Sequence, residues 1–93
     1  NQSLQNRNPL KFIDVNKENK KDGSTPLYLA CESGLIEIVK LLLKNPHIQV
    51  NKSRNDRTTP FFISCQNNHI ELVELFIKDK RADTNLERDG GYC

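Results

Sequence analysis

The pattern of apolar and polar positions in residues 22–44 recurs 34 positions later, in residues 56–78, where nine of the 23 aligned residues are identical. The C-terminal part of each copy carries apolar residues at the spacing of one helix face. We therefore predict equivalent helices over residues 36–44 and 70–78. Their buried faces are expected to comprise Ile36, Val39, Leu42 and Leu43 in the first helix and Ile70, Val73, Phe76 and Ile77 in the second.

A shorter helix is predicted before each of these, starting at the pairs Thr25-Pro26 and Thr59-Pro60. Thr can cap free backbone amides, and Pro is tolerated at the first helical position, where its missing N–H would have no partner. Each short helix is expected to span about two turns and to stop before a residue type that tolerates the left-handed conformation. The expected ends are Ser33 before Gly34, and Asn67 before Asn68.

Polar segments separate the helix pairs, over residues 17–24, 52–58 and 86–91. A short apolar alternation that leads into a polar tip with Asp-Gly or Asn-Asp is typical of a hairpin-like loop. We call the first two segments the first finger (17–24) and the second finger (52–58), and we expect a third to begin as the chain stops. Each is preceded by an Asn at nearly constant spacing: Asn16, Asn51 and Asn85.

A repeated unit of this length predicts a stack of modules, because each unit buries its open face against the next. The segment TPLYLAC at 25–31 resembles the TPLHxA signature of ankyrin repeats, and GLIEIVKLLL at 34–43 resembles the family's second helix. TPFFISC at 59–65 and NHIELVELFI at 68–77 are more degenerate copies. The spacing is close to the family's period of about 33 residues. The resemblance covers residues 17–91.

The resemblance implies an all-α fold, an ankyrin-repeat solenoid of stacked helix-turn-helix pairs with projecting fingers, in which two full repeats have partial units on either side. We expect a partial preceding repeat or leader with the first finger at 1–21, repeats at 22–55 and 56–88, and the start of a further repeat at 89–93. The chain is expected to be a piece of a longer array. Stacked repeats generally need about three units, so we expect marginal stability or end-to-end self-association.

Composition and cysteine usage narrow the class of protein. Only 35% of the 93 residues are hydrophobic, which suits short helices better than one large core, and the net charge of +2 does not by itself indicate nucleic acid binding. No apolar run reaches membrane-spanning length.

Cys31 and Cys65 are repeat equivalents, expected roughly 8–10 Å apart, which is too far for a disulfide. Reduced thiols favour an intracellular, cytoplasmic location.

No catalytic residue, cofactor or metal ion is predicted, and the chain is not expected to be an enzyme. A zinc site needs about four ligands at matched spacing, which the two repeat cysteines, His47 and His69 do not provide. His69 stands where the ankyrin pattern itself has His, at a helix start. Tyr28 and Phe62 replace the signature His of the first helix, so the backbone hydrogen bonds which that His makes in the family are not expected.

A protein-binding surface remains the favoured function. The repeats differ most at the fingers and at the ends of the short helices, and in the family these regions form a concave face that binds other proteins. The finger tips are also more basic than the rest of the chain. The candidate partner-binding residues are Lys20, Lys21, Asp22, Ser24, Glu32, Ser33, Arg54, Asn55, Asp56, Arg57, Thr58, Gln66 and Asn67.

The favoured partner is another protein with an acidic or mixed-polarity surface, whose charge would mainly set the association rate and the choice of partner. An alternative is binding of an anionic ligand, nucleic acid or lipid, through the basic tips. The tips lack aromatic residues for base stacking, which argues against single-stranded nucleic acid. A further alternative is that the segment regulates a larger enzyme.

Overall fold

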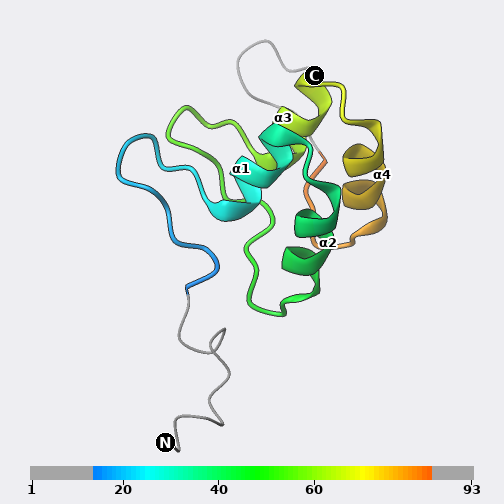
Figure 1. Ribbon diagram of the computed structural model, residues 1–93, viewed down its shortest axis with the longest axis horizontal. Coiled ribbons are helices and arrows are strands. Elements are labelled where there is room, and N and C mark those ends of the chain that lie inside the picture. Colours follow the sequence, from blue (N-terminus) through cyan, green and yellow to red (C-terminus); the bar gives the residue numbers. More distant parts are fainter. Residues whose placement is uncertain (1–13, 85–93) are drawn as a thin grey trace, which may run out of the picture.

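The computed structural model describes residues 14–84 (Figure 1). Within that range it has four helices and no strand: α1 (Pro26–Ser33), α2 (Ile36–Lys44), α3 (Pro60–Gln66) and α4 (Ile70–Lys78). The predicted all-α fold and the repeated order of short helix, turn and longer helix are confirmed. The bounds differ from the prediction only in that α3 ends one residue earlier, at Gln66.

The helices form two layers (Figure 1). α1 packs against α3 and α2 packs against α4, while the two helices of each pair also contact one another. The first and second fingers project from the side of α1 and α3, away from α2 and α4. Equivalent elements of the two repeats therefore lie side by side, as the 34-residue spacing predicted. The third finger and the segments 1–13 and 85–93 lie outside the described residues, and the repeat boundaries stay a prediction.

The Thr-Pro pairs begin the short helices as expected. The Thr25 hydroxyl accepts a hydrogen bond from the backbone N–H of Tyr28 at 3.1 Å, and the Thr59 hydroxyl accepts one from Phe62 at 3.0 Å. Pro occupies the first helical position in both helices. Each cap satisfies one of the amides that a helix N-terminus leaves without an internal partner.

Gly34 ends α1 in the left-handed conformation, with a φ of 71°. Its counterpart Asn68 has a φ of 64°, so the substitution preserves the backbone geometry. Gly34 also lies against the second repeat, because a Cβ placed there would come within 2.8 Å of the His69 ring. Asn also tolerates this backbone conformation, but at position 34 the close approach of His69 favours Gly.

One hydrophobic core runs through both repeats and takes buried side chains from all four helices. Phe61 of α3 meets Phe76 of α4 edge to face, with ring centroids 6.1 Å apart, an arrangement that aromatic pairs prefer. Both cysteines are predicted to be buried; Cys31 is buried, whereas Cys65 is only half-buried. Both are reduced, as predicted. Burial raises the pKa of the Cys31 thiol to about 12. The fully buried hydrophobic side chains are Leu27, Tyr28, Cys31, Val39, Leu72 and Phe76.

The predicted buried faces of the longer helices are only partly correct. Val39 and Phe76 are fully buried, but Ile70 and Ile77 are 58% and 63% exposed, and Leu72, which was not predicted, is fully buried. Ile36, Leu42, Leu43 and Val73 lie partly buried against the core. The reason is positional: α2 covers one side of α4, and no described element covers the other side.

Equivalent positions of α2 and α4 differ in burial, and this difference allows a test of the packing. Leu72→Ala should lower the free energy of unfolding by about 2–5 kcal/mol, because it deletes a fully buried side chain between the repeats. Ile38→Ala changes the equivalent position in α2, where the side chain is 46% exposed, and should cost well under half as much. Urea unfolding followed by circular dichroism measures both. Equal losses would contradict the proposed location of the core.

Candidate interaction surface

The two fingers share one construction. In the first finger, the Asp22 carboxylate accepts hydrogen bonds from the backbone N–H of Ser24 at 3.0 Å and from its hydroxyl at 2.7 Å. In the second, Asp56 accepts from the backbone N–H of Thr58 at 3.0 Å. These bonds favour the charged carboxylates and lower the pKa of Asp22. Both Asp residues therefore hold their own loops in shape.

Arg54 contacts two side chains of the protein itself, Asp56 and Tyr28. Its guanidinium donates two hydrogen bonds to the Asp56 carboxylate, at 2.7 and 3.3 Å, and lies over the Tyr28 ring with 4.8 Å to the centroid. The ion pair lowers the pKa of Asp56 and raises that of Arg54. A bidentate, ring-stacked guanidinium is more firmly placed than an ordinary surface cation. The charge of Arg54 is thus compensated within the protein.

The fingers are joined to each other at their tips. The backbone N–H of Asn55 donates to the backbone carbonyl of Asp22 at 2.9 Å. Gly23 lies at the same contact, since a Cβ there would come within 2.3 Å of the Asn55 side chain. Lys52 of the second finger also pairs with Glu18 of the first. The two fingers consequently present one continuous surface.

Four exposed cations of the fingers remain: Lys17, Lys20, Lys21 and Arg57. None of them has an ion pair within residues 14–84. Arg57 lies in the left-handed conformation with a φ of 72° at the tip of its loop. Glu18, Asn19, Asn55 and Asp56 are exposed as well. Glu18 and Asp56 form ion pairs within the fingers, and Asn19 accepts hydrogen bonds from Asp22 and Gly23, so Asn55 and the four cations are the side chains most open to a partner.

The remaining candidate residues divide by burial and by hydrogen bonding. Ser24 and Thr58 are buried, so we remove them from the candidate surface. Ser33 and Gln66 are exposed at the ends of α1 and α3, and Glu32 is half-buried. Asn67 is exposed, but its side-chain amide donates to the Glu32 carbonyl at 3.1 Å. Asn67 therefore links the two repeats.

Polar contacts between repeats also lie at the far end of the helices. The Asn16 side chain donates to the His47 carbonyl and accepts from the Gln49 N–H, both at 2.8 Å. Asn51 makes the same pair of bonds with the Arg81 carbonyl and the Asp83 N–H, at 2.9 and 2.6 Å. The regular spacing of these Asn residues was visible in the sequence, but their role was not predicted.

Arg81 and His69 add two contacts that tie the second repeat to the first. The Arg81 guanidinium pairs with Asp79 and donates to the carbonyls of Leu43 and Asn45 at the end of α2. A cation at that point also suits the negative end of the helix dipole. His69 directly precedes α4, as expected, and its Nε2 lies 3.2 Å from the Glu32 carbonyl oxygen.

Neither a metal site nor a membrane span is found in the described part of the chain. Residues 14–84 contain no group of three or more His, Cys, Asp or Glu side chains that could hold a metal ion. None of the described helices is long and apolar enough to cross a membrane.

The sequence matches a protein-family model. A family model described as ankyrin repeats (3 copies) matches residues 3–88. A search of curated proteins found no match for the chain. The matched range includes both helix pairs and both fingers described above.

The Asp residues of the loops predict that stability falls in acid. The pKa values of Asp22, Asp56 and Asp79 lie below the unfolded value of about 3.9. These carboxylates therefore stabilise the fold above about pH 4, and their contribution is lost as the pH falls through the folded-state pKa. The urea midpoint should be lower at about pH 3 than at about pH 6. In Asp56→Asn the urea midpoint should fall less between pH 6 and pH 3 than in the wild type. An equal fall in the variant and the wild type would argue against the Arg54–Asp56 pair as a source of stability.

Tyr28 offers a second test, because its hydroxyl is buried without a hydrogen-bond partner among the described residues. Tyr28→Phe keeps the ring under Arg54 and removes the unsatisfied group, so it should stabilise the protein by up to about 1 kcal/mol. The equivalent position already holds Phe62. Phe62→Tyr should destabilise the protein, because it adds a hydroxyl at a buried position. Thermal unfolding of both variants measures this. A clear loss of stability in Tyr28→Phe would show that the hydroxyl has a partner.

Proposed function

The chain belongs to the ankyrin repeat family, and from that premise we propose that it binds a partner protein through its joined fingers and the exposed ends of α1 and α3. Ankyrin repeats generally act as protein-protein interaction modules. The proposed surface consists of Lys20, Lys21, Asn55, Arg57, Glu32, Ser33 and Gln66.

One observation carries this proposal. Of the finger cations, Arg54 and Lys52 are compensated by Asp56 and Glu18. Lys17, Lys20, Lys21 and Arg57 are exposed without an ion pair in the described range. Uncompensated charges on a loop that is fixed by hydrogen bonds are available to a partner without a cost of rearrangement. Their sign favours an acidic segment of the partner.

Recognition of single-stranded nucleic acid is less well supported. Such binding uses exposed aromatic side chains on which bases stack. The four aromatic side chains of residues 14–84 are all buried: Tyr28, Phe61, Phe62 and Phe76. The reduced state of Cys31 and Cys65 supports a reducing, intracellular compartment for the proposed interaction.

A charge reversal tests the proposed surface. A random peptide library displayed on phage is selected against the wild-type chain, and the affinity of the selected peptides is measured by fluorescence polarisation. We expect acidic peptides, with binding at least about tenfold weaker to the double variant Lys21→Glu/Arg57→Glu, because each reversal replaces an attraction with a repulsion.

The matched control is Lys44→Glu/Lys80→Glu, which makes the same change in net charge at two exposed residues outside the fingers. This control should bind the peptides like the wild type. Equal weakening in both double variants would mean that the effect comes from net charge and not from the fingers. A titration with single-stranded and duplex oligonucleotides at two salt concentrations completes the test, since tight binding with a steep salt dependence would favour nucleic acid.

A further inference from the structure

Arg57 has a backbone conformation that is unusual for its residue type. Its φ of 72° lies in the left-handed region, which L side chains rarely adopt. Of the residues that the structure describes, Asn68 is the other non-glycine residue with a positive φ, and Asn tolerates this region better than Arg does. Arg57 is therefore held in a strained conformation.

The first finger shows which residue type this position favours. The residue 34 positions before Arg57 is Gly23, and it has nearly the same φ, 78°. Because Gly adopts this conformation without a steric penalty, the second finger would be more stable with Gly at position 57. A residue that costs stability at an exposed loop tip indicates a function of its side chain.

The guanidinium of Arg57 has no ion pair in the described range, and the carboxylates of the two joined tips are already occupied. Asp56, its neighbour in the loop, accepts two hydrogen bonds from Arg54. Asp22 of the first finger accepts two from Ser24. The N–H groups of the Arg57 side chain therefore stay available to a group from outside the described part of the chain.

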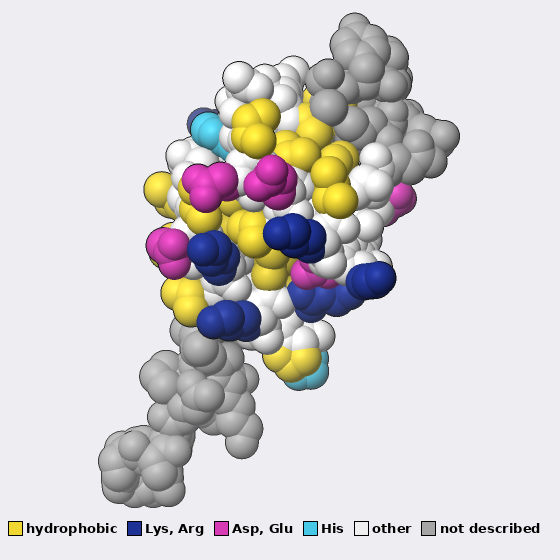
Figure 2. Space-filling model, turned by 90° about the vertical axis from the view of Figure 1, so that its right-hand side faces the viewer, with side chains coloured by type: hydrophobic (Ala, Val, Ile, Leu, Met, Phe, Trp, Pro, Cys, Tyr) yellow, Lys and Arg dark blue, Asp and Glu magenta, His cyan; other side chains and the backbone are white. Residues whose placement is uncertain are grey.

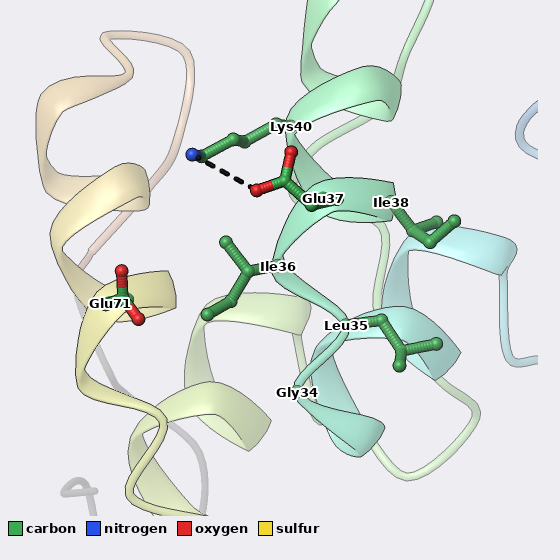
Figure 3. Close-up of a pocket in the computed structure, with 7 residues that line it drawn as sticks. All are labelled: Gly34, Leu35, Ile36, Glu37, Ile38, Lys40 and Glu71. Carbon is green, nitrogen blue, oxygen red and sulfur yellow. Dashed lines mark ion pairs between the residues drawn. The ribbon is translucent and has the colours of Figure 1, made fainter.

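Charged side chains on the helix surface differ in this respect. Figure 2 shows basic and acidic side chains interspersed on the face where α2 and α4 lie. On α2, Lys40 pairs with Glu37 at 3.6 Å, and a dashed line marks this pair in Figure 3. The uncompensated charge of Arg57 is thus a property of the finger and not of the surface in general.

The junction between the two fingers also depends on which residue stands at this position. A Cβ at Gly23 would come within 2.3 Å of the Asn55 side chain and 3.2 Å of its backbone N, so the close contact of the fingers favours Gly there. Arg57 carries a Cβ at the equivalent place. A following finger that approached the second as closely would meet this Cβ, so the same junction does not repeat at Arg57.

We propose that Arg57 is the residue that determines which partner segment the fingers bind, and that it holds an Asp or Glu carboxylate of the partner in a bidentate contact. This inference rests on the proposed function and specifies its chemistry. A guanidinium presents parallel N–H donors that match the two oxygens of a carboxylate, whereas a Lys ammonium is a point charge. The Arg54–Asp56 pair already shows such a contact within the same loop.

The lysines of the fingers have a different part in the proposed binding. Lys17, Lys20 and Lys21 attract an acidic segment over a longer distance, which mainly raises the association rate. Arg57 contacts one carboxylate directly and so sets the dissociation rate. Charge attraction by the lysines brings many acidic segments to the fingers, and the fit to Arg57 selects among them.

The strained loop presents the guanidinium from a fixed backbone. The backbone N–H of Arg54 donates to the carbonyl of Thr58 at 2.8 Å, and the N–H of Arg57 donates to the carbonyl of Arg54 at 2.9 Å. Because these bonds fix the loop before a partner arrives, binding loses less conformational entropy than it would with a flexible loop.

Two glycine substitutions in the full chain separate strain from charge. Arg57→Gly removes a cation and relieves the left-handed backbone, so the urea midpoint should rise. Lys21→Gly removes the same charge at an exposed residue without a positive φ, so the midpoint should fall. An unchanged or lower midpoint in Arg57→Gly would overturn the proposal, because the strain would then be absent or offset by contacts of the side chain within the protein.

Binding kinetics separate the role of Arg57 from that of the lysines. The probe is an acidic peptide selected by the wild-type chain in the display experiment, and surface plasmon resonance measures both rates. Arg57→Gly should weaken binding at least about tenfold and Arg57→Lys at least about threefold, both through faster dissociation, although Arg57→Lys keeps the charge. Lys21→Gly should mainly slow association, most strongly at low salt.

Variants of the peptide identify the carboxylate. Each Asp or Glu of the peptide is changed in turn to Asn or Gln, and one change should weaken binding to the wild-type chain much more than the others. The same change should have little further effect on binding to Arg57→Gly, because the carboxylate has already lost its partner there. Equal effects in both proteins would mean that Arg57 does not hold that carboxylate, and the proposal would be wrong.

The outcomes distinguish this proposal from the proposed function. If the wild type binds acidic peptides and the Arg57 variants bind them equally well, the fingers bind a partner but Arg57 does not select it. If the wild-type chain selects no acidic peptide, the proposed function fails, and the role of Arg57 fails with it whatever the glycine variants show for stability.

Discussion

The packing of one repeat against the next is the contact on which the rest of this structure depends. A pair of two-turn helices has too little interior to bury its own apolar residues, and the fully buried side chains lie where the repeats meet. Leu72 and Phe76 of α4 and Val39 of α2 are fully buried where α4 packs against α2 and α3 and α2 packs against α1 and α4. Isolated helices of this length would be marginal in water. Secondary structure and tertiary packing therefore form together.

Polar groups set the register of that packing. Apolar burial is not directional, so it would tolerate a shift of one repeat along the other. The bonds of Asn16 and Asn51 at one end of the helices, and of Asn67 at the other, fix specific carbonyls and amides of neighbouring repeats at hydrogen-bond distance. The same register brings the Asn55 amide to the Asp22 carbonyl and joins the fingers. The shape of the finger surface is thus a consequence of the helix stacking.

Much of the fold could be predicted from sequence, because the signals for it are local. The Thr-Pro starts and the residues at 34 and 68 act through their own backbone geometry, and the structure has them as predicted. The exposure of Ile70 and Ile77 could not be predicted in this way. Helical periodicity marks an apolar side chain but does not say whether another element covers it. That depends on which neighbour is present, which is a non-local property.

For the candidate site as well, the local sequence pattern was predictable and the three-dimensional contacts were not. Counting Lys and Arg identified the fingers as basic but could not separate compensated from uncompensated charges. Arg54 is neutralised by Asp56 two residues later, within one loop, and is fixed over Tyr28 from the neighbouring helix. Lys21 and Arg57 have the same formal charge and no such partner in the described residues. Because an internal ion pair must be broken before its members can bind elsewhere, we expect the uncompensated residues to dominate the proposed recognition. Arg54 holds the loop that presents Arg57.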